Sequence, residues 1–202
     1  GLTSDLPYRG QAIFFHKEGE TDGYLSNYYP THLAMIGGFQ ASDLIPIPFR
    51  DYPYNLLPLT SGFSSSEHAF MYMKASAFGD VKTMQRIQSA VKPGDAKRLG
   101  RKIKGFIHRM WGYISTSAMT AAIMAKFDDP TLGQKLQETW PKALFEASPR
   151  DNAWGIGISA EDALSEDTTI FPGKNKLGMC LHFARAKLIA GAGAPMGEVN
   201  TI

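Results

Sequence analysis

The sequence predicts a single, mostly helical domain with few strands. From Gly62 onward, apolar residues recur every three or four positions behind capping residues, which is the spacing of amphipathic helices. Two short segments, QAIFF (residues 11–15) and ALFEA (residues 143–147), favour strands. No internal repeat interrupts the chain, and its 202 residues suffice for one domain with a full core.

The region before Gly62 is the least regular. After the strand at 11–15 comes a polar turn and then YLSNYYP, in which Ser26 and Asn27 form either a simple turn or part of a polar site. Between residues 37 and 62 four prolines alternate with aromatic residues and leucines. Prolines at this density exclude a helix and a central strand, so we expect a long ordered insertion or a lid.

Helix starts are marked by capping residues. Ser66 is expected to cap a helix that ends near Phe78, and Asp80 to cap the next one. We expect further helices from Pro93, from about residue 116 to 127, after Pro130 and over residues 175–189, followed by a flexible tail at 191–202.

Composition is that of an ordinary soluble protein, with 44% hydrophobic and 20% charged residues. No apolar run is long enough to span a membrane, and the N-terminal segment lacks the apolar core of a signal peptide. Cys180, the sole cysteine, is predicted to be buried in a helix. These features favour a cytoplasmic location.

Positive charge is concentrated in one segment although the net charge is only +2. A cluster of this kind forms either a solvated helix face or an anion site, and contact with nucleic acid is a third reading. The cluster consists of Lys92, Lys97, Arg98, Arg101, Lys102, Lys104 and Arg109, with Asp95 as its one acid.

Glu67 falls in the first turn of the helix predicted after Ser66. The helix N-terminus stabilises an ionised carboxylate, which suits a base, a nucleophile or a group that stabilises positive charge. Lys74 lies two turns later on the same face, about 10 Å along the axis. The alternative is that Glu67 only complements the helix dipole, and His68 is expected to be a hydrogen-bonded structural residue. No helix carries a metal-ligand spacing, so neither a metal nor another cofactor is expected.

Two later segments carry further polar groups. In EASPRDNAWGIG, Asp151 and Trp154 either satisfy a turn and fill the core, or contact a planar base and its polar atoms. In GKNKLG, Asn175 is placed to cap the last helix, and Lys174 beside the free N–H groups of that helix start would make an anion site.

The ordered series FF, YLSNYYP, SSSEHAFMYMKA, FGD, AKRLGR, AKF, EASPRDNAWGIG and GKNKLG resembles the NADAR family, the YbiA-like N-glycosidases. The resemblance runs from about Phe14 to Leu188. It implies one YbiA-like domain over residues 1–190, mainly α with a small β component (α+β). It also implies hydrolysis of the bond between ribose and a nitrogenous base. Family members act on phosphorylated intermediates of riboflavin synthesis, and some relatives remove ADP-ribose from guanine, so nucleic acid carrying a modified base is a conceivable partner.

Carried over residue by residue, the resemblance makes Glu67 and Asp151 the catalytic carboxylates, with individual roles left open. Trp154 is the candidate for stacking on the base, and cationic groups are candidates for phosphate. The expected substrate-binding residues are Ser26, Asn27, Lys74, Lys97, Arg101, Trp154, Lys174 and Asn175. The alternative function is a module that binds ADP-ribose or a nucleotide without cleaving it.

Overall fold

The computed structural model describes residues 10–34, 62–165 and 170–192. The chain divides into two compact units. The described residues among 1–16, 20–26 and 127–202 form the strand unit, and those among 17–19 and 27–126 form the helical unit. The expectation of a mainly α fold with a small β component is confirmed. That residues 1–190 act as one domain stays a prediction. The insertion at 37–62, except Gly62, and the tail after residue 192 lie outside the described residues.

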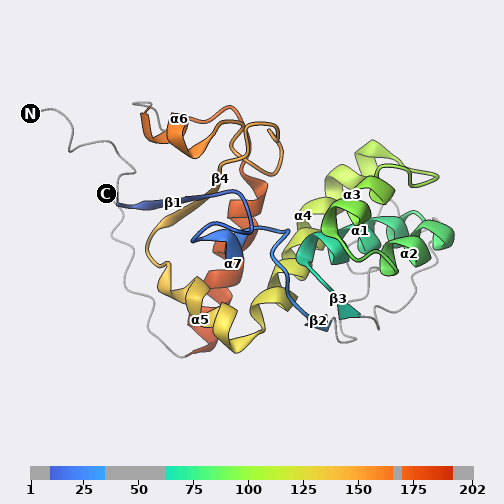
Figure 1. Ribbon diagram of the computed structural model, residues 1–202, viewed down its shortest axis with the longest axis horizontal. Helices are drawn as coiled ribbons and strands as arrows, with labels where there is room; N and C mark the ends of the chain where they lie inside the picture. Colours follow the sequence, from blue (N-terminus) through green and yellow to red (C-terminus); the bar gives the residue numbers. More distant parts are fainter. Residues whose placement is uncertain (1–9, 35–61, 166–169, 193–202) are drawn as a thin grey trace, which may run out of the picture. The chain divides into compact units, whose positions relative to one another are not determined.

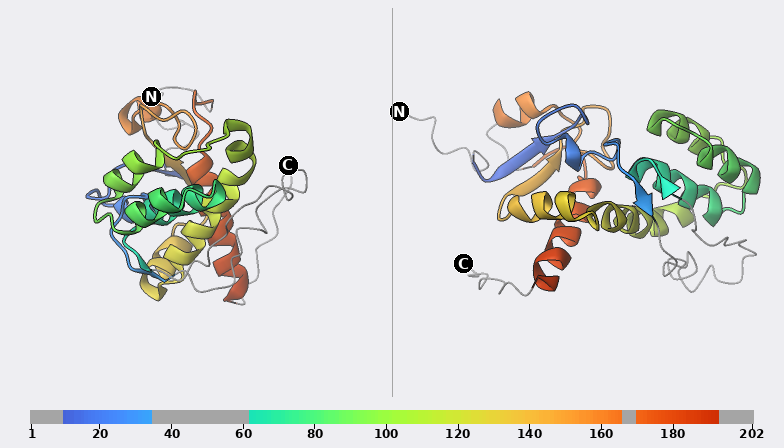
Figure 2. Two further views of the ribbon diagram at one scale, coloured as in Figure 1. Left: turned by 90° about the vertical axis from the view of Figure 1, so that its right-hand side faces the viewer. Right: turned by 60° about the horizontal axis from the view of Figure 1, so that its bottom comes forward.

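The helical unit is built on three neighbouring helices. α1 (Ser66–Ala77) contacts both α2 (Val81–Gln88) and α3 (Pro93–Gly100), and these two also contact each other. Figure 1 and both views in Figure 2 show the three side by side. A short antiparallel pair, β2 (Leu33–Ala34) with β3 (Gly62–Phe63), precedes α1. α4 (His108–Phe127) belongs to this unit as far as Lys126.

Local capping explains where the first helices start. Ser65, one residue before the predicted cap, accepts a hydrogen bond from the backbone N–H of His68 at 3.1 Å, so Ser66 is the first residue of α1. Asp80 caps α2 as predicted, by accepting from Thr83 N–H at 3.0 Å. Pro93 occupies the first turn of α3, where its missing N–H costs nothing.

α4 begins at His108, eight residues before the predicted start at 116. Glycine and β-branched or serine residues make up about half of its first ten positions and lower the local helix propensity. Packing overrides that propensity, because Met110 and Ile114 are fully or almost fully buried against Ala77 of α1. None of the helices among the described residues is long and apolar enough to span a membrane.

The strand unit pairs the two predicted strands. β1 (Ala12–Phe15) runs parallel to β4 (Ala143–Glu146), with Ala12 opposite Ala143 and Phe15 opposite Glu146. α7 (Lys176–Gly191) contacts both β4 and α5 (Pro130–Glu138). The short α6 (Ala160–Ser165) was not predicted, and a 3₁₀ turn (Gly23–Leu25) leads to Ser26.

Aromatic rings cover one side of the strand pair. Phe14 stacks on Phe145 with ring centroids 5.3 Å apart, and Phe171 meets both rings edge-on. This cluster packs around buried Ala147 and Ile156. It therefore anchors the loop that follows β4, which contains Asp151 and Trp154.

Candidate active site

The helical unit places Glu67 at the second position of α1, where its side chain is only 4% exposed. The YLSNYYP segment is fastened to this helix start by the backbone. Glu67 N–H donates to the carbonyl of Asn27 at 3.1 Å. Ser66 Oγ lies 3.2 Å from the same carbonyl and 3.1 Å from Asn27 Oδ1. Asn27 is itself buried, and its contacts with Ser66 and Glu67 hold the start of α1 in place.

Lys74, two turns along α1, is half-buried and held by its neighbours. Its Nζ donates to the carbonyl of Gly100 at 3.0 Å and lies 4.3 Å from the ring centroid of Phe106. Burial lowers the pKa of Lys74; Glu67 opposes that shift and Arg101 adds to it. Lys74 therefore interacts electrostatically with both Glu67 and Arg101.

Tyr28 joins the same set of charges. Burial raises the pKa of its hydroxyl, and Glu67 raises it further, while Lys97 and Arg101 oppose the shift. Lys97 forms a side-chain hydrogen bond with Tyr28, and its Nζ lies 5.6 Å from the ring centroid. We call Glu67, Lys74, Lys97, Arg101 and Tyr28 the Glu67 cluster.

Close packing of α1 on α3 brings the cluster together. A Cβ added at Gly100 would collide with the side chain of Met71, so the two helices approach where α3 carries no side chain. This approach puts the last turn of α3 next to Lys74. Lys97, in the last turn of α3, and Arg101, the residue that follows α3, both act on Tyr28.

In the strand unit, the segment before α7 runs against the loop after β4. Gly173 N–H donates to the carbonyl of Ile156 at 2.7 Å, and Lys174 N–H donates to Asn152 at 2.9 Å. A Cβ at Gly173 would strike the backbone of residues 155–157. Only glycine fits this backbone crossing. We call residues 152–157 with 173–177 the crossing.

Asp151 organises the loop side of the crossing. Its Oδ1 accepts from the backbone N–H groups of Ala153 at 2.9 Å and Trp154 at 2.8 Å. The turn interpretation of Asp151 is therefore correct for this oxygen, although the carboxylate as a whole is half-exposed. Trp154 is also half-exposed and so does not simply fill the core; Lys176 Nζ lies 5.6 Å from its ring centroid.

The start of α7 differs from the prediction. Asn175 occupies the cap position with a left-handed backbone (φ 50°), but its side chain does not cap the helix. Instead its Oδ1 accepts from Glu146 N–H at 3.0 Å and its Nδ2 donates to Leu144 O at 2.9 Å, which ties α7 to β4. The N–H groups at the helix start donate to the carbonyls of residues 153 and 154. The N–H groups of residues 174–177 are therefore not free for an anion, and the binding of substrate by Lys174 and Asn175 stays a prediction.

The predicted site residues fall into two groups. Asn27, Glu67, Lys74, Lys97 and Arg101 gather in the helical unit. Ser26, Asp151, Trp154, Lys174 and Asn175 belong to the strand unit; Ser26 is buried at the end of the 3₁₀ turn and Lys174 is exposed.

Two polar residues were not identified from the sequence. They are Tyr28, which belongs to the Glu67 cluster, and Lys126, which is a buried cation. Lys126 is 1% exposed, its Nζ lies 5.4 Å from the ring centroid of Tyr29, and burial lowers its pKa to about 7. A signal for it exists in the sequence, since Lys126 continues the buried stripe of Met119 and Ile123 at helical spacing.

His68 is structural, as predicted. Its Nε2 lies 2.6 Å from Ile87 O and its Nδ1 lies 3.1 Å from Ser64 Oγ. Burial lowers the pKa of its imidazole. Among the described residues, no three side chains of His, Cys, Asp or Glu gather as metal ligands, and the expectation of a metal-free protein stays a prediction.

Known proteins share this sequence pattern and fold. The chain is 32% identical over 163 residues to an N-glycosidase of Acanthamoeba polyphaga mimivirus, covering 80% of this chain and 94% of that protein. A riboflavin biosynthesis protein of Vibrio vulnificus is 26% identical over 179 residues, which cover 88% of this chain but 39% of that longer protein. The NMR structure of YbiA from E. coli has the same fold, with a TM-score of 0.66 at 22% identity, covering 95% of this chain and 92% of YbiA.

The family model of the NADAR domain matches residues 13–189, which is most of the chain. The match begins in β1 and ends in α7, so it includes both the Glu67 cluster and the crossing. The chain belongs to the NADAR family.

Proposed function

We propose that the protein is an N-glycosidase that hydrolyses the bond between a ribose and a nitrogenous base. The observation that carries the proposal is Glu67, a buried carboxylate that interacts electrostatically with Lys74 and Tyr28, in a chain of the NADAR family. The mimivirus relative named an N-glycosidase supports the same reaction class.

The reaction calls for a carboxylate of this kind. As the bond between C1′ and the base nitrogen breaks, its electron pair leaves with the base, and the ribose gains oxocarbenium character. A nearby carboxylate stabilises this positive charge, or orients the water that adds to C1′ and loses a proton. We assign that role to Glu67.

The cations of the cluster suit a phosphorylated ribose or an ADP-ribose. Arg101 is exposed and can offer a guanidinium fork to phosphate, with Lys97 one helical turn away. Lys174 is a further exposed cation, in the strand unit. Substrates of the proposed enzyme are therefore anionic N-ribosides, either a phosphorylated ribosylamino-pyrimidine or an ADP-ribosylated guanine.

Asp151 is the second carboxylate of the proposal. Because its Oδ1 holds the turn, Asp151 would contribute through its remaining oxygen, by contacting ribose hydroxyls or by assisting protonation of the leaving base. Trp154 follows three residues later and offers a face for a planar base.

The test is release of free base, followed by chromatography, from a ribosylamino-pyrimidine phosphate and from ADP-ribosylated guanosine. Glu67→Gln keeps the side-chain shape and removes the charge, so we expect the rate to fall at least about 100-fold. The matched control is Glu161→Gln, at an exposed position of α6, which should leave the rate unchanged. Base release that survives Glu67→Gln would refute the assigned role.

Asp151→Asn separates the turn from the chemistry. Asparagine keeps an oxygen that can accept from residues 153 and 154, so the melting temperature should stay within a few degrees while the rate falls roughly tenfold. Should calorimetry show tight binding of ADP-ribose compounds with no base released from either substrate, the protein would be a binding module instead.

A cytoplasmic location belongs to the same proposal. Cys180, the sole cysteine of the chain, is buried in α7, which agrees with a protein that needs no disulfide. Localisation of a fluorescent fusion tests it.

A further inference from the structure

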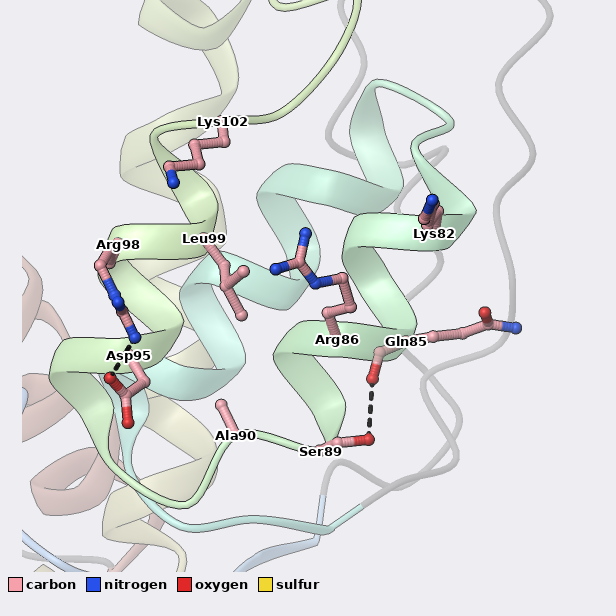
Figure 3. A pocket seen from close by; sticks show the side chains of 9 residues that line it. All are labelled: Lys82, Gln85, Arg86, Ser89, Ala90, Asp95, Arg98, Leu99 and Lys102. Atoms are coloured by element: carbon pink, nitrogen blue, oxygen red, sulfur yellow. Dashed lines mark hydrogen bonds and ion pairs between the residues drawn. The ribbon is translucent and has the colours of Figure 1, made fainter.

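A basic groove lies between α2 and α3, on the helical unit. It has a volume of about 620 Å³. Figure 3 shows Lys82 and Arg86 on α2 and Arg98 on α3. Lys102 comes from the turn that follows α3. The aliphatic side chain of Leu99 lies between the two sets.

The side chains that line the groove are mostly positively charged. Four cations line it, and Asp95 is the one carboxylate among its described lining residues. Asp95 pairs with Arg98 at 2.8 Å, and both side chains are well exposed, at 47% and 70%. Such an exposed pair is weak, so Arg98 can exchange this partner for a stronger anion.

The groove is separate from the Glu67 cluster although both use α3. Lys97 and Arg101 act on Tyr28, which belongs to the cluster. Arg98 follows Lys97 by one position, which is about 100° around α3, and lines the groove together with Lys102, which follows Arg101 in the turn after α3. Four cations of the basic segment noticed in the sequence are therefore divided between two sites: Lys97 and Arg101 act on Tyr28, whereas Arg98 and Lys102 line the groove.

The arrangement of the cations favours a chain of phosphates over a single anion. Lys82 and Arg86 are four residues apart on α2, so this pair spans about 6 Å along the helix. Arg98 is in α3, and Lys102 is the second residue after α3 ends. The four cations thus come from two different elements that line the groove, and a lone phosphate could reach only part of them. Among the described residues that line the groove, none is aromatic, so it offers no platform for stacking bases.

We propose that this groove binds the phosphodiester backbone of single-stranded nucleic acid. Charge complementarity carries the proposal, and the lack of a stacking surface makes the binding independent of sequence. The arginines supply forked donors and the lysines supply point charges to successive phosphates. The proposal does not depend on the N-glycosidase activity, since no residue of the Glu67 cluster lines the groove.

The experiment is fluorescence anisotropy with a labelled oligothymidylate of about 12 nucleotides, titrated at several salt concentrations. Wild-type protein should bind with an affinity that falls linearly on a log–log plot against salt. In Lys82→Gln/Arg86→Gln, loss of two phosphate contacts should lower the slope by about 1.4 and weaken binding at least about fivefold. Asp95→Asn removes the opposing carboxylate and should tighten binding about two- to threefold.

Matched controls make the result specific to the groove. Arg109→Gln/Lys142→Gln removes two exposed cations elsewhere, and its affinity should equal that of the wild type. Base release from a small N-riboside should be unchanged in Lys82→Gln/Arg86→Gln, which separates this test from that of the proposed function.

Three results would overturn the proposal. They are no binding by the wild type at low salt, an equal loss in both double variants, and inorganic pyrophosphate binding as tightly as the oligonucleotide. The last result would identify a site for a small anion.

Discussion

The start of α1 and the start of α7 were both predicted to be polar sites, and they differ in what their side chains do. At each helix start, backbone N–H groups donate to protein acceptors: those of α1 to Asn27 O and Ser65 Oγ, those of α7 to the carbonyls of the crossing. At α1 the side chain of Glu67 joins a cluster of charges. At α7 the side chain of Asn175 forms two hydrogen bonds with the backbone of β4.

The difference shows that a helix N-terminus is not an anion site when its donors are already used. The chemistry proposed for α1 rests on side-chain charge, which can be removed without breaking the hydrogen bonds of the backbone. At the crossing, the hydrogen bonds are mostly between backbone groups, so substitutions there should act on stability first. The following variants test that contrast.

The largest effect is expected at the crossing. In Gly173→Ala the new Cβ would meet the backbone of residues 155–157, which cannot move aside as a flexible side chain can. We expect a loss of more than about 3 kcal/mol in the free energy of unfolding. Chemical denaturation measures it. Gly94→Ala is the control, because a Cβ there meets nothing within 4 Å, and it should be neutral or stabilising. Equal stability of the two variants would contradict the packing described here.

The next largest effect is expected at Lys126 in the helical unit, where burial of the lysine should make the free energy of unfolding depend on pH. The ordinary pKa of lysine is 10.5, and burial lowers that of Lys126 to about 7. Between these values the unfolded chain binds a proton that the folded chain does not, so stability rises as pH increases from about 7 and is lost as pH falls from 10.5. The gradient is at most about 1.4 kcal/mol per pH unit.

Lys126→Met removes this gradient while filling a similar volume. Thermal or chemical unfolding from about pH 7.5 to about pH 9.5 compares the two proteins, and other titrating groups cancel in the difference. Lys142→Met, at an exposed position, should keep the wild-type slope. Parallel stability curves for wild type and Lys126→Met would show that Lys126 is charged in the folded protein at neutral pH.

A smaller effect is expected at Asn175. Asn175→Gly keeps the left-handed backbone accessible but removes both hydrogen bonds to β4, and should cost about 1 to 3 kcal/mol. Asn175→Ala adds backbone strain and should cost somewhat more. Differential scanning calorimetry resolves this ranking. If alanine were better tolerated than glycine, the left-handed conformation would be refuted.

Much of the fold could be predicted from local signals. Asp80 and Pro93 mark helix starts through hydrogen bonds and backbone angles that involve only a few neighbouring residues. The start of α4 could not be predicted in this way, because burial of Met110 and Ile114 against α1 decides it. The parallel pairing of β1 with β4 likewise joins segments about 130 residues apart, and no local pattern encodes it.

In the candidate site too, features that depend on residue type could be predicted, and features that depend on distant partners could not. Glu67, Lys97 and Arg101 were named from the family resemblance, and the helical unit brings them together. The role of Asn175 was wrong because its partners, Leu144 and Glu146, lie about 30 residues away. Side-chain chemistry could thus be anticipated from residue types, whereas the choice between a ligand and a distant backbone partner could not.

The three tryptophans occupy three separate environments. The ring centroid of Trp111 lies 5.7 Å from Lys74 Nζ, Trp154 lies beside Lys176, and Trp140 lies beside Arg185. Each indole is therefore a built-in optical reporter of its own region. Chains that retain one indole and carry phenylalanine at the other two positions would let quenching of intrinsic emission reveal which region a ligand touches, without any attached dye.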